Sequence, residues 1–292
     1  MNRPENGPIK NVQAFVPSHI TGFFAAHRKE EPHLSGSVGC GLCLSLGAIT
    51  TIQSGAHIHD TEILLNGALS EAPVSRFVVE RLAKAPVRVK TDLQMPSGAG
   101  FGASGAGALS CAYALNSLFD LGLTANQAAA VAHQAEVMNR TGLGDVIAQN
   151  AGGLVVRQQP GAPGTGLIDR VPVPPLPISY VVHGPISTSQ VLSDEKVMKA
   201  VNLAGEAALM ELLKRPTFAN FMQLSRRFTV NSGLASDWAL QAIEAVEAAG
   251  GMAGMIMLGD AVFAFGGAGA EALKGFGEVH TTTISQRGAN LD

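Results

Sequence analysis

The segment MPSGAGFGASGAGALS, residues 95–110, constrains this chain more than any other stretch. It contains five glycines, three serines and no charged residue. Glycine at this density weakens the interior of a helix or strand, and it favours a backbone that approaches another group closely. A strand is predicted just before the segment, and a helix is predicted from about Ser104. This order presents free N–H groups and the positive end of a helix dipole, which favour an anion such as phosphate.

Two common phosphate-binding patterns fit the segment poorly. The Walker loop requires a lysine, and residues 95–110 contain none, so that loop is excluded. A dinucleotide fingerprint is formally present as Gly100, Gly102 and Gly105, with Asp120 downstream. However, Asp120 is predicted to end a helix and not a second strand, where the ribose-binding carboxylate belongs. The dinucleotide interpretation is therefore the weaker one.

Composition limits the class of protein and its partners. With 292 residues, of which 46% are hydrophobic and 15% charged, the chain can bury a large core. The net charge of -3 and the scattered Lys and Arg residues predict no nucleic-acid partner. The start, MNRPENGPIK, lacks the apolar core of a signal peptide, and the longest uncharged stretch, residues 34–59, is rich in Gly, Ser and Thr. We therefore expect a cytoplasmic protein without a membrane partner.

Three cysteines are too few for a disulfide framework, as in a reducing compartment. Cys40 and Cys43 form a C-x-x-C pattern within a strand-like stretch. Because residues three apart on a strand point to opposite faces, a shared metal is disfavoured. Both are predicted to be small core residues.

The proline-rich segment PVPPLP, residues 172–177, divides the chain, because prolines at this density continue neither a helix nor a central strand. It predicts an α+β protein with domains at residues 1–171 and 178–292. In the first domain, strands are expected at 11–16, 41–52, 61–67, 85–93 and 152–157, and helices from about residues 104 and 124. In the second, a strand is expected at 178–184, helices at about 189–213, 217–229 and 236–249, a hairpin at 254–265 turning at Gly259 and Asp260, a helix at 269–276 and a strand at 278–284. Apart from additional helices, the second order is the β-α-β-β-α-β order of ferredoxin-like domains.

Residues Pro96–Gly105 resemble, at nearly every position, the phosphate loop of the GHMP kinase superfamily. The segment VAHQAEVMNRTGLGDVIAQNAGG is similar to the part of those kinases that carries a metal-binding glutamate and a catalytic aspartate, and FVPSHITGFF is similar to their N-terminal motif. With GPISTSQVLSDE and FMQLSRRF, these segments together closely resemble the archaeal pantoate kinase family. The resemblance covers essentially the whole chain.

The resemblance implies a two-domain GHMP kinase fold, with a left-handed crossover in the N-terminal α/β domain and a ferredoxin-like C-terminal domain. It also implies ATP-dependent phosphorylation of the primary hydroxyl of pantoate, with Mg²⁺, to give 4-phosphopantoate on the archaeal route to coenzyme A. A homodimer is a further expectation. Two alternatives remain: another GHMP small-molecule kinase, of mevalonate or homoserine type, or a non-catalytic ligand sensor of the same fold.

Site residues follow from the resemblance position by position. The implied nucleotide-binding residues are Pro96, Ser97, Gly98, Ala99, Gly100, Phe101, Gly102, Ala103, Ser104 and Gly105. Ser104 and Glu136 are the implied magnesium ligands, and Asp145 is the implied base that accepts the hydroxyl proton. From pattern alone, Ser104 also fits a helix N-cap, Glu136 a solvated helix face, and Asp145 an N-cap that is compatible with its catalytic role.

Two histidines are candidates for positioning substrate. His133 shares one helix face with Glu136, three residues later. His19 occupies the place where many relatives of the superfamily have lysine. Because a neutral imidazole supplies less positive charge than lysine, His19 is not expected simply to replace it.

An acidic substrate also requires a donor for its carboxylate. Arg157 ends the apolar strand GGLVVR, and its guanidinium fits a carboxylate with two parallel hydrogen bonds. Alternatively, Arg157 leaves the strand for solvent. Ser187 and Thr188 precede a predicted helix and are expected to donate to the same anion.

The third glycine-rich motif of the superfamily falls, by position, on residues 258–261, although residues 266–269 contain more glycine. Because we give more weight to position in the chain than to glycine content, we expect residues 258–261 to form this motif.

Overall fold

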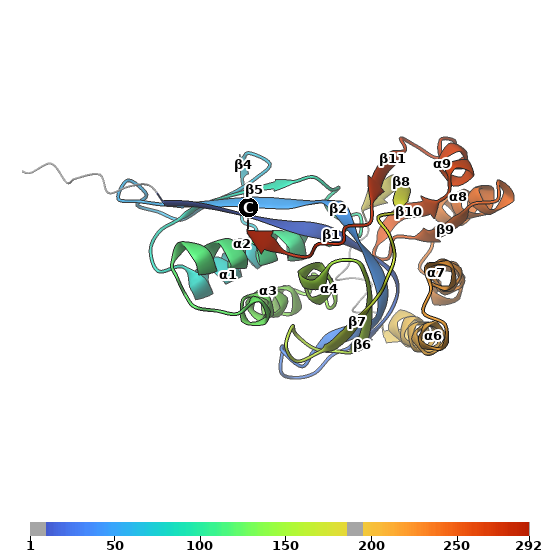
Figure 1. Cartoon of the computed structure of the whole chain (residues 1–292), viewed down its shortest axis with the longest axis horizontal. Coiled ribbons are helices and arrows are strands. Elements are labelled where there is room, and N and C mark those ends of the chain that lie inside the picture. The colour runs from blue at the N-terminus through green and yellow to red at the C-terminus, as the bar shows by residue number, and fades with distance from the viewer. Residues whose placement is uncertain (1–9, 186–194, 292) are drawn as a thin grey trace, which may run out of the picture.

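The computed structural model describes residues 10–185 and 195–291, which form an α+β fold with two β-sheets (Figure 1). The strands are β1 Lys10–His27, β2 Gly36–Ser54, β3 Glu62–Leu65, β4 Ala68–Leu69, β5 Arg88–Leu93, β6 Leu154–Gln159, β7 Leu167–Val171, β8 Pro177–Pro185, β9 Met252–Met255, β10 Gly259–Phe265, β11 His280–Thr283 and β12 Asn290–Leu291. The helices are α1 Pro73–Leu82, α2 Ala103–Leu118, α3 Ala125–Asn139, α4 Asp145–Ala151, α6 Glu195–Lys214, α7 Phe218–Ser232, α8 Asp237–Ala248 and α9 Gly267–Leu273. No helix within the two described ranges is both long and apolar enough to cross a membrane.

The first sheet has the strand order β12-β1-β2-β5-β3-β4, and a second branch, β6-β7, pairs with β2. Helices α1 to α4 lie on one face of this sheet (Figure 1). β3 and β5 pair in parallel and are joined through β4 and α1. Cys40 and Cys43 are buried and belong to different apolar clusters, which confirms that they are core residues.

The long β1–β2 hairpin bends because its register shifts twice, between Pro17 and Ser18 and between Thr21 and Phe23. Extra residues in one strand of an antiparallel pair increase its bend and twist. Figure 1 shows both strands curving away from the flat part of the sheet. The bend brings β1 to the glycine-rich loop, where the His19 N–H donates to the Phe101 carbonyl at 3.1 Å.

The second sheet has the order β11-β8-β10-β9, and all of its pairs are antiparallel. This order confirms the predicted ferredoxin-like arrangement. The hairpin prediction was wrong in detail, because the turn lies at Met257 and Leu258, two residues earlier than expected. Gly259 is already in β10. A Cβ there would lie 2.1 Å from the backbone of Ala99, so this glycine permits a close approach and does not form the turn itself.

Helices α6 and α7 pack on the bent end of β1 (Figure 1). A Cβ on Gly205 of α6 would lie 1.9 Å from the Phe24 carbonyl oxygen, and one on Gly22 would lie 2.2 Å from Ser225 Oγ in α7. The proline-rich segment connects β7 of the first sheet to β8 of the second, whereas β12 returns to pair with β1. We keep 1–171 and 178–292 as a proposed domain division, in which β12 of the second range pairs with β1 of the first.

We predict that Gly205→Ala lowers the free energy of unfolding by about 1–3 kcal/mol, because the new methyl group meets backbone that must shift. Denaturant unfolding measures this change. The matched control is Gly267→Ala in α9, where a Cβ would meet no described atom within 4 Å, and where stability should be unchanged or slightly higher. Equal effects of the two substitutions would contradict the close packing of α6 on β1.

Candidate active site

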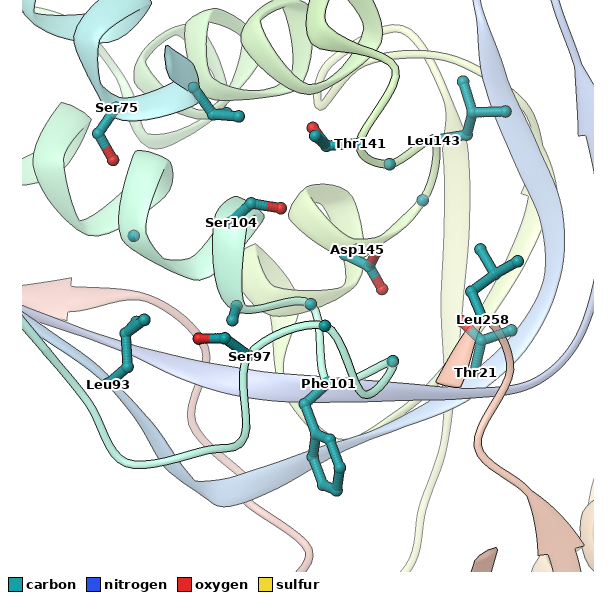
Figure 2. Close-up of a pocket in the computed structure, with 18 of the residues that line it drawn as sticks. Thr21, Ser75, Leu93, Ser97, Phe101, Ser104, Thr141, Leu143, Asp145 and Leu258 are labelled. Carbon is teal, nitrogen blue, oxygen red and sulfur yellow. The ribbon is translucent and has the colours of Figure 1, made fainter. Parts of the chain in front are cut away.

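A pocket of about 470 Å³ lies at the N-terminus of α2 and is lined by both halves of the chain. Figure 2 shows Ser75 and Leu93 toward one end of the pocket, and Thr21, Leu143 and Leu258 toward the other. Ser104 and Asp145 lie between them. The pocket is therefore elongated, with the helix N-terminus near its middle.

The glycine-rich loop shapes its backbone with three glycines in the left-handed region, Gly98, Gly100 and Gly102, at φ 75°, 83° and 65°. These values suit glycine, which has no Cβ penalty there. Gly102 is the N-cap of α2, and none of the described side chains caps it. The first N–H groups of α2 are thus left for a ligand, and the helix dipole favours a negative one.

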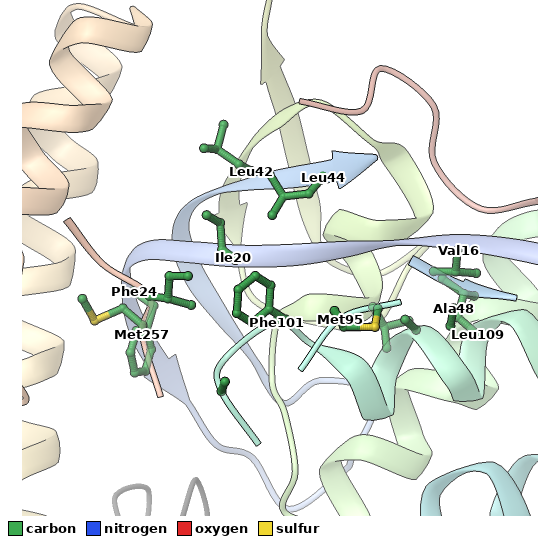
Figure 3. Packing of buried hydrophobic residues seen from close by; sticks show 14 of the residues in the cluster. Val16, Ile20, Phe24, Leu42, Leu44, Ala48, Met95, Phe101, Leu109 and Met257 are labelled. Carbon is green, nitrogen blue, oxygen red and sulfur yellow. The ribbon is translucent and has the colours of Figure 1, made fainter. Parts of the chain in front are cut away.

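The predicted nucleotide-binding residues divide into two groups. The pocket is lined by Ser97, Gly98, Gly100, Phe101, Gly102, Ala103 and Ser104. Pro96, Ala99 and Gly105 are not among its described lining residues. The Phe101 ring points into the core near Ile20 and Met95 (Figure 3), and it packs edge-on against Tyr180 with ring centroids 4.9 Å apart. Phe101 therefore anchors the loop to the hydrophobic core.

Glu136 of α3 is buried beside this helix terminus. Its Oε1 accepts a hydrogen bond from Thr141 Oγ1 at 2.6 Å, whereas Oε2 is buried with no hydrogen-bond partner in the described chain. Burial raises the pKa of Glu136 to about 7, although the hydroxyls of Thr141 and Ser104 favour the charged form. An unpartnered buried carboxylate oxygen near a serine hydroxyl is a donor set that suits Mg²⁺. The residues present therefore fit the magnesium ion that the family resemblance implies.

Asp145 is the first residue of α4, and its carboxylate is held from one side. Its Oδ1 lies 2.7 Å from Nδ1 of the buried His19, and His19 Nε2 lies 3.4 Å from Nη1 of the buried Arg157. Arginine only donates, so Nε2 accepts and Nδ1 carries the proton that is donated to Asp145. Burial lowers the pKa of His19, against the hydrogen bond that it donates to Asp145. The Arg157 donor at Nε2 requires an unprotonated nitrogen there, so this geometry is that of a neutral imidazole. His19 therefore orients Asp145 and leaves Oδ2 free of this contact.

Of the remaining predicted substrate residues, only Arg157 is in the described lining of the pocket. Arg157 lines the pocket from β6, and its Nε is buried without a partner in the described ranges. His133 is buried, its Nε2 lies 2.8 Å from the Ser35 carbonyl oxygen, and it is absent from the described pocket lining. Burial lowers the pKa of His133. Ser187 and Thr188 lie outside the described residues.

Sequence reasoning missed one part of the lining and predicted a second part only by the expected position of the third motif. Residues 70–75, at and before the start of α1, line the end of the pocket near Leu93. Met257 and Leu258 line the opposite end from the β9–β10 turn. The expected position of the third motif pointed to this turn, and Gly259 indeed packs against Ala99. At Gly266 and Gly267, by contrast, an added Cβ would meet no described atom within 4 Å.

Comparisons with known proteins agree with this geometry. Residues 64–153 match the family described as GHMP kinases N terminal domain. The pantoate kinase of Thermococcus kodakarensis is 40% identical over 266 residues, covering 87% of each chain, and that of Methanospirillum hungatei is 35% identical over 289 residues, covering 96% of each. A solved structure named "Phosphotransferase related to CoA biosynthesis pathway" is 33% identical and superposes with a TM-score of 0.88, covering 97% of this chain and 99% of its own. The chain belongs to the pantoate kinase family of the GHMP kinases.

Proposed function

We propose that this protein transfers the γ-phosphoryl group of ATP to the primary hydroxyl of pantoate, which gives 4-phosphopantoate for coenzyme A biosynthesis. The observation that carries the proposal is that Ser104 and Asp145 line the pocket at the free N-terminus of α2, while Glu136, which is not among the described lining residues, is buried directly beside that terminus. The names of the relatives supply the acceptor. The same arrangement argues against a non-catalytic sensor, which has no need of a base beside a phosphate site.

Phosphoryl transfer requires positioning and charge neutralisation more than covalent chemistry. The backbone N–H groups that begin α2 bind the phosphates of ATP, and Ser97 adds a hydroxyl from the pocket wall. Glu136 Oε2 and the Ser104 hydroxyl hold the magnesium ion. When bound, this ion neutralises the charge that develops on the phosphoryl oxygens. The nucleoside extends toward Leu93 and Ser75.

Acceptor chemistry takes place between Asp145 and the end of the pocket that is lined by Leu143 and Leu258. Asp145 Oδ2 accepts the proton of the hydroxyl, while His19 holds Oδ1. Arg157 Nε, which has no partner in the described chain, donates to the substrate carboxylate near Gly144. Ser187 and Thr188 remain proposed donors to the same group. No contact supports the predicted substrate role of His133, because its ring bonds to the Ser35 carbonyl and neither residue is in the described lining of the pocket.

The cellular context is proposed on chemical grounds. The three cysteines all lie in the described chain and are all free, as expected in a reducing compartment such as the cytoplasm. A homodimer and the absence of a nucleic-acid partner remain predictions.

A panel of acceptor alcohols tests the function. Purified protein with ATP and Mg²⁺ is supplied with pantoate, mevalonate or homoserine, and ADP release is measured. We expect release above background with pantoate and a far lower kcat/KM with the other two. Release with mevalonate or homoserine alone would overturn the assignment to pantoate while keeping the family.

We predict that Asp145→Asn lowers kcat ~10²–10⁴-fold, because the amide keeps the shape of the carboxylate but takes no proton. ATP affinity, measured by calorimetry, should stay nearly unchanged. If the variant retained more than about a tenth of the wild-type kcat, Asp145 would not be the base.

We predict that Glu136→Gln and Ser104→Ala each weaken the apparent affinity for Mg²⁺, because the first replaces a charged carboxylate by a neutral amide and the second removes a hydroxyl oxygen. A magnesium titration of ATP-dependent turnover measures this effect. Thr141→Val is the matched control, because its hydroxyl contacts Glu136 Oε1 and not the unpartnered oxygen, and its effect should be smaller. Titration curves that overlay the wild type for both site variants would remove the metal assignment.

We predict that Arg157→Lys raises the KM for pantoate, because a point charge replaces the planar fork. Arg157→Ala should cost ~1.5–3 kcal/mol in kcat/KM for pantoate, with the KM for ATP little changed. Steady-state kinetics with each substrate varied in turn separate the two effects. Wild-type KM values for pantoate in both variants would place the carboxylate elsewhere.

A further inference from the structure

Leu258 has a backbone conformation that is unusual for a bulky apolar residue. Its φ is 65°, in the left-handed region that costs a residue with a Cβ. Glycine or asparagine would adopt this turn conformation at less cost. Strain of this kind persists where the surroundings hold it, and it gathers at ligand sites. Leu258 also lines the pocket.

The turn that carries Leu258 is fixed on three sides. The Met257 N–H donates to the Thr21 carbonyl of β1 at 3.2 Å, and Gly259 packs against the backbone of Ala99. On the far side, Asp260 accepts a hydrogen bond from Ser236 Oγ at 2.6 Å and lies 2.8 Å from His183 Nδ1. These contacts tie the turn to β1, the phosphate loop and the C-terminal domain. The Leu258 side chain is thus held at a set place in the pocket.

The neighbours of Leu258 in the pocket make an apolar wall at the acceptor end. Phe24, Leu143 and Met257 line the pocket with it and are themselves largely buried. Figure 2 shows Asp145 between Ser104 and the end of the pocket where Leu143 and Leu258 lie, and Figure 3 shows Phe24 beside Met257. A base therefore faces a space that is bounded by branched and aromatic carbon. A small, fully hydrated acceptor would gain nothing from such a wall.

We propose that Leu258, with Leu143 and Phe24, is a specificity determinant that selects an acceptor whose primary hydroxyl is borne next to a quaternary, dimethyl-substituted carbon. This inference rests on the proposed function, since it explains how the site recognises the part of pantoate that linear hydroxy acids lack. The two methyl groups fill the space between the wall and Asp145, and the hydroxyl then meets the carboxylate in one orientation. Binding of the methyl groups thereby supports alignment for in-line transfer.

The test compares pantoate with 2,4-dihydroxybutanoate, which keeps the carboxylate and both hydroxyls but lacks the two methyl groups. Since one methylene in an apolar pocket is worth ~10–200-fold in kcat/KM, we expect the wild type to prefer pantoate by at least ~10-fold. Leu258→Ala should reduce this ratio by ~5–10-fold through a loss on pantoate, with the KM for ATP unchanged.

Two further variants keep the test decisive. Leu258→Asn relieves the backbone strain and approximately keeps the volume, so thermal stability should be equal or higher while the preference for pantoate still falls. Leu65→Ala makes the same truncation in the same pocket, away from the turn. It should change the KM for ATP and leave the acceptor ratio as in the wild type.

The outcomes separate this inference from the function on which it rests. A wild type that phosphorylates pantoate, together with Leu258 variants whose acceptor ratio stays within about twofold of it, would overturn the role of Leu258 alone. A wild type that phosphorylates neither acid would overturn the proposed function and this inference with it. An equal fall in the preference for pantoate in Leu65→Ala would also overturn the inference, because the effect would then not be specific to the apolar wall of Leu258, Leu143 and Phe24.

Discussion

Close approach between two backbones is the constraint on which the site depends. The glycine-rich loop lies against the β9–β10 turn so tightly that a Cβ on Gly100 would be 2.5 Å from the Met257 carbonyl oxygen, and one on Gly259 would be 2.1 Å from Ala99. Glycine at both positions removes the side chains that would separate the two halves. Because the bent end of β1 hydrogen-bonds to both the loop and the turn, one contact region positions both the proposed phosphate site and the proposed acceptor wall.

Three charged side chains, those of Arg157, Asp145 and Glu136, lie close to the glycine-rich loop. The guanidinium of Arg157 is buried behind a neutral His19, which in turn orients the Asp145 carboxylate. Glu136 is buried nearby with one oxygen unpartnered among the described residues, and burial alone makes its charged form costly. A cation bound between Glu136 and Ser104 would relieve that cost. In the proposed mechanism, Glu136 is therefore placed to bind a metal ion and Asp145 to accept a proton.

Local patterns predicted much of the fold and part of the site. Glycine spacing predicted the glycine-rich loop before α2, and the order of strands and helices predicted the ferredoxin-like sheet, because both rest on short-range signals. Helix α1 was not predicted, since its N-cap, Ala72, makes no side-chain cap. The Leu258 turn was placed two residues late, because glycine usually marks a turn, whereas Gly259 here serves a contact with a residue far away in the sequence. The link from Arg157 through His19 to Asp145 spans more than a hundred residues, so no local pattern encodes it.

A crystal structure of the complex with a non-hydrolysable ATP analogue, Mg²⁺ and pantoate tests the central claim most directly. The measured quantity is the distance from the primary hydroxyl oxygen of pantoate to the carboxylate of Asp145. Our account predicts a separation of about 2.6–3.2 Å, with His19 still bonded to the other carboxylate oxygen. A hydroxyl that points to a different base, with Asp145 beyond reach even through one water molecule, would contradict it.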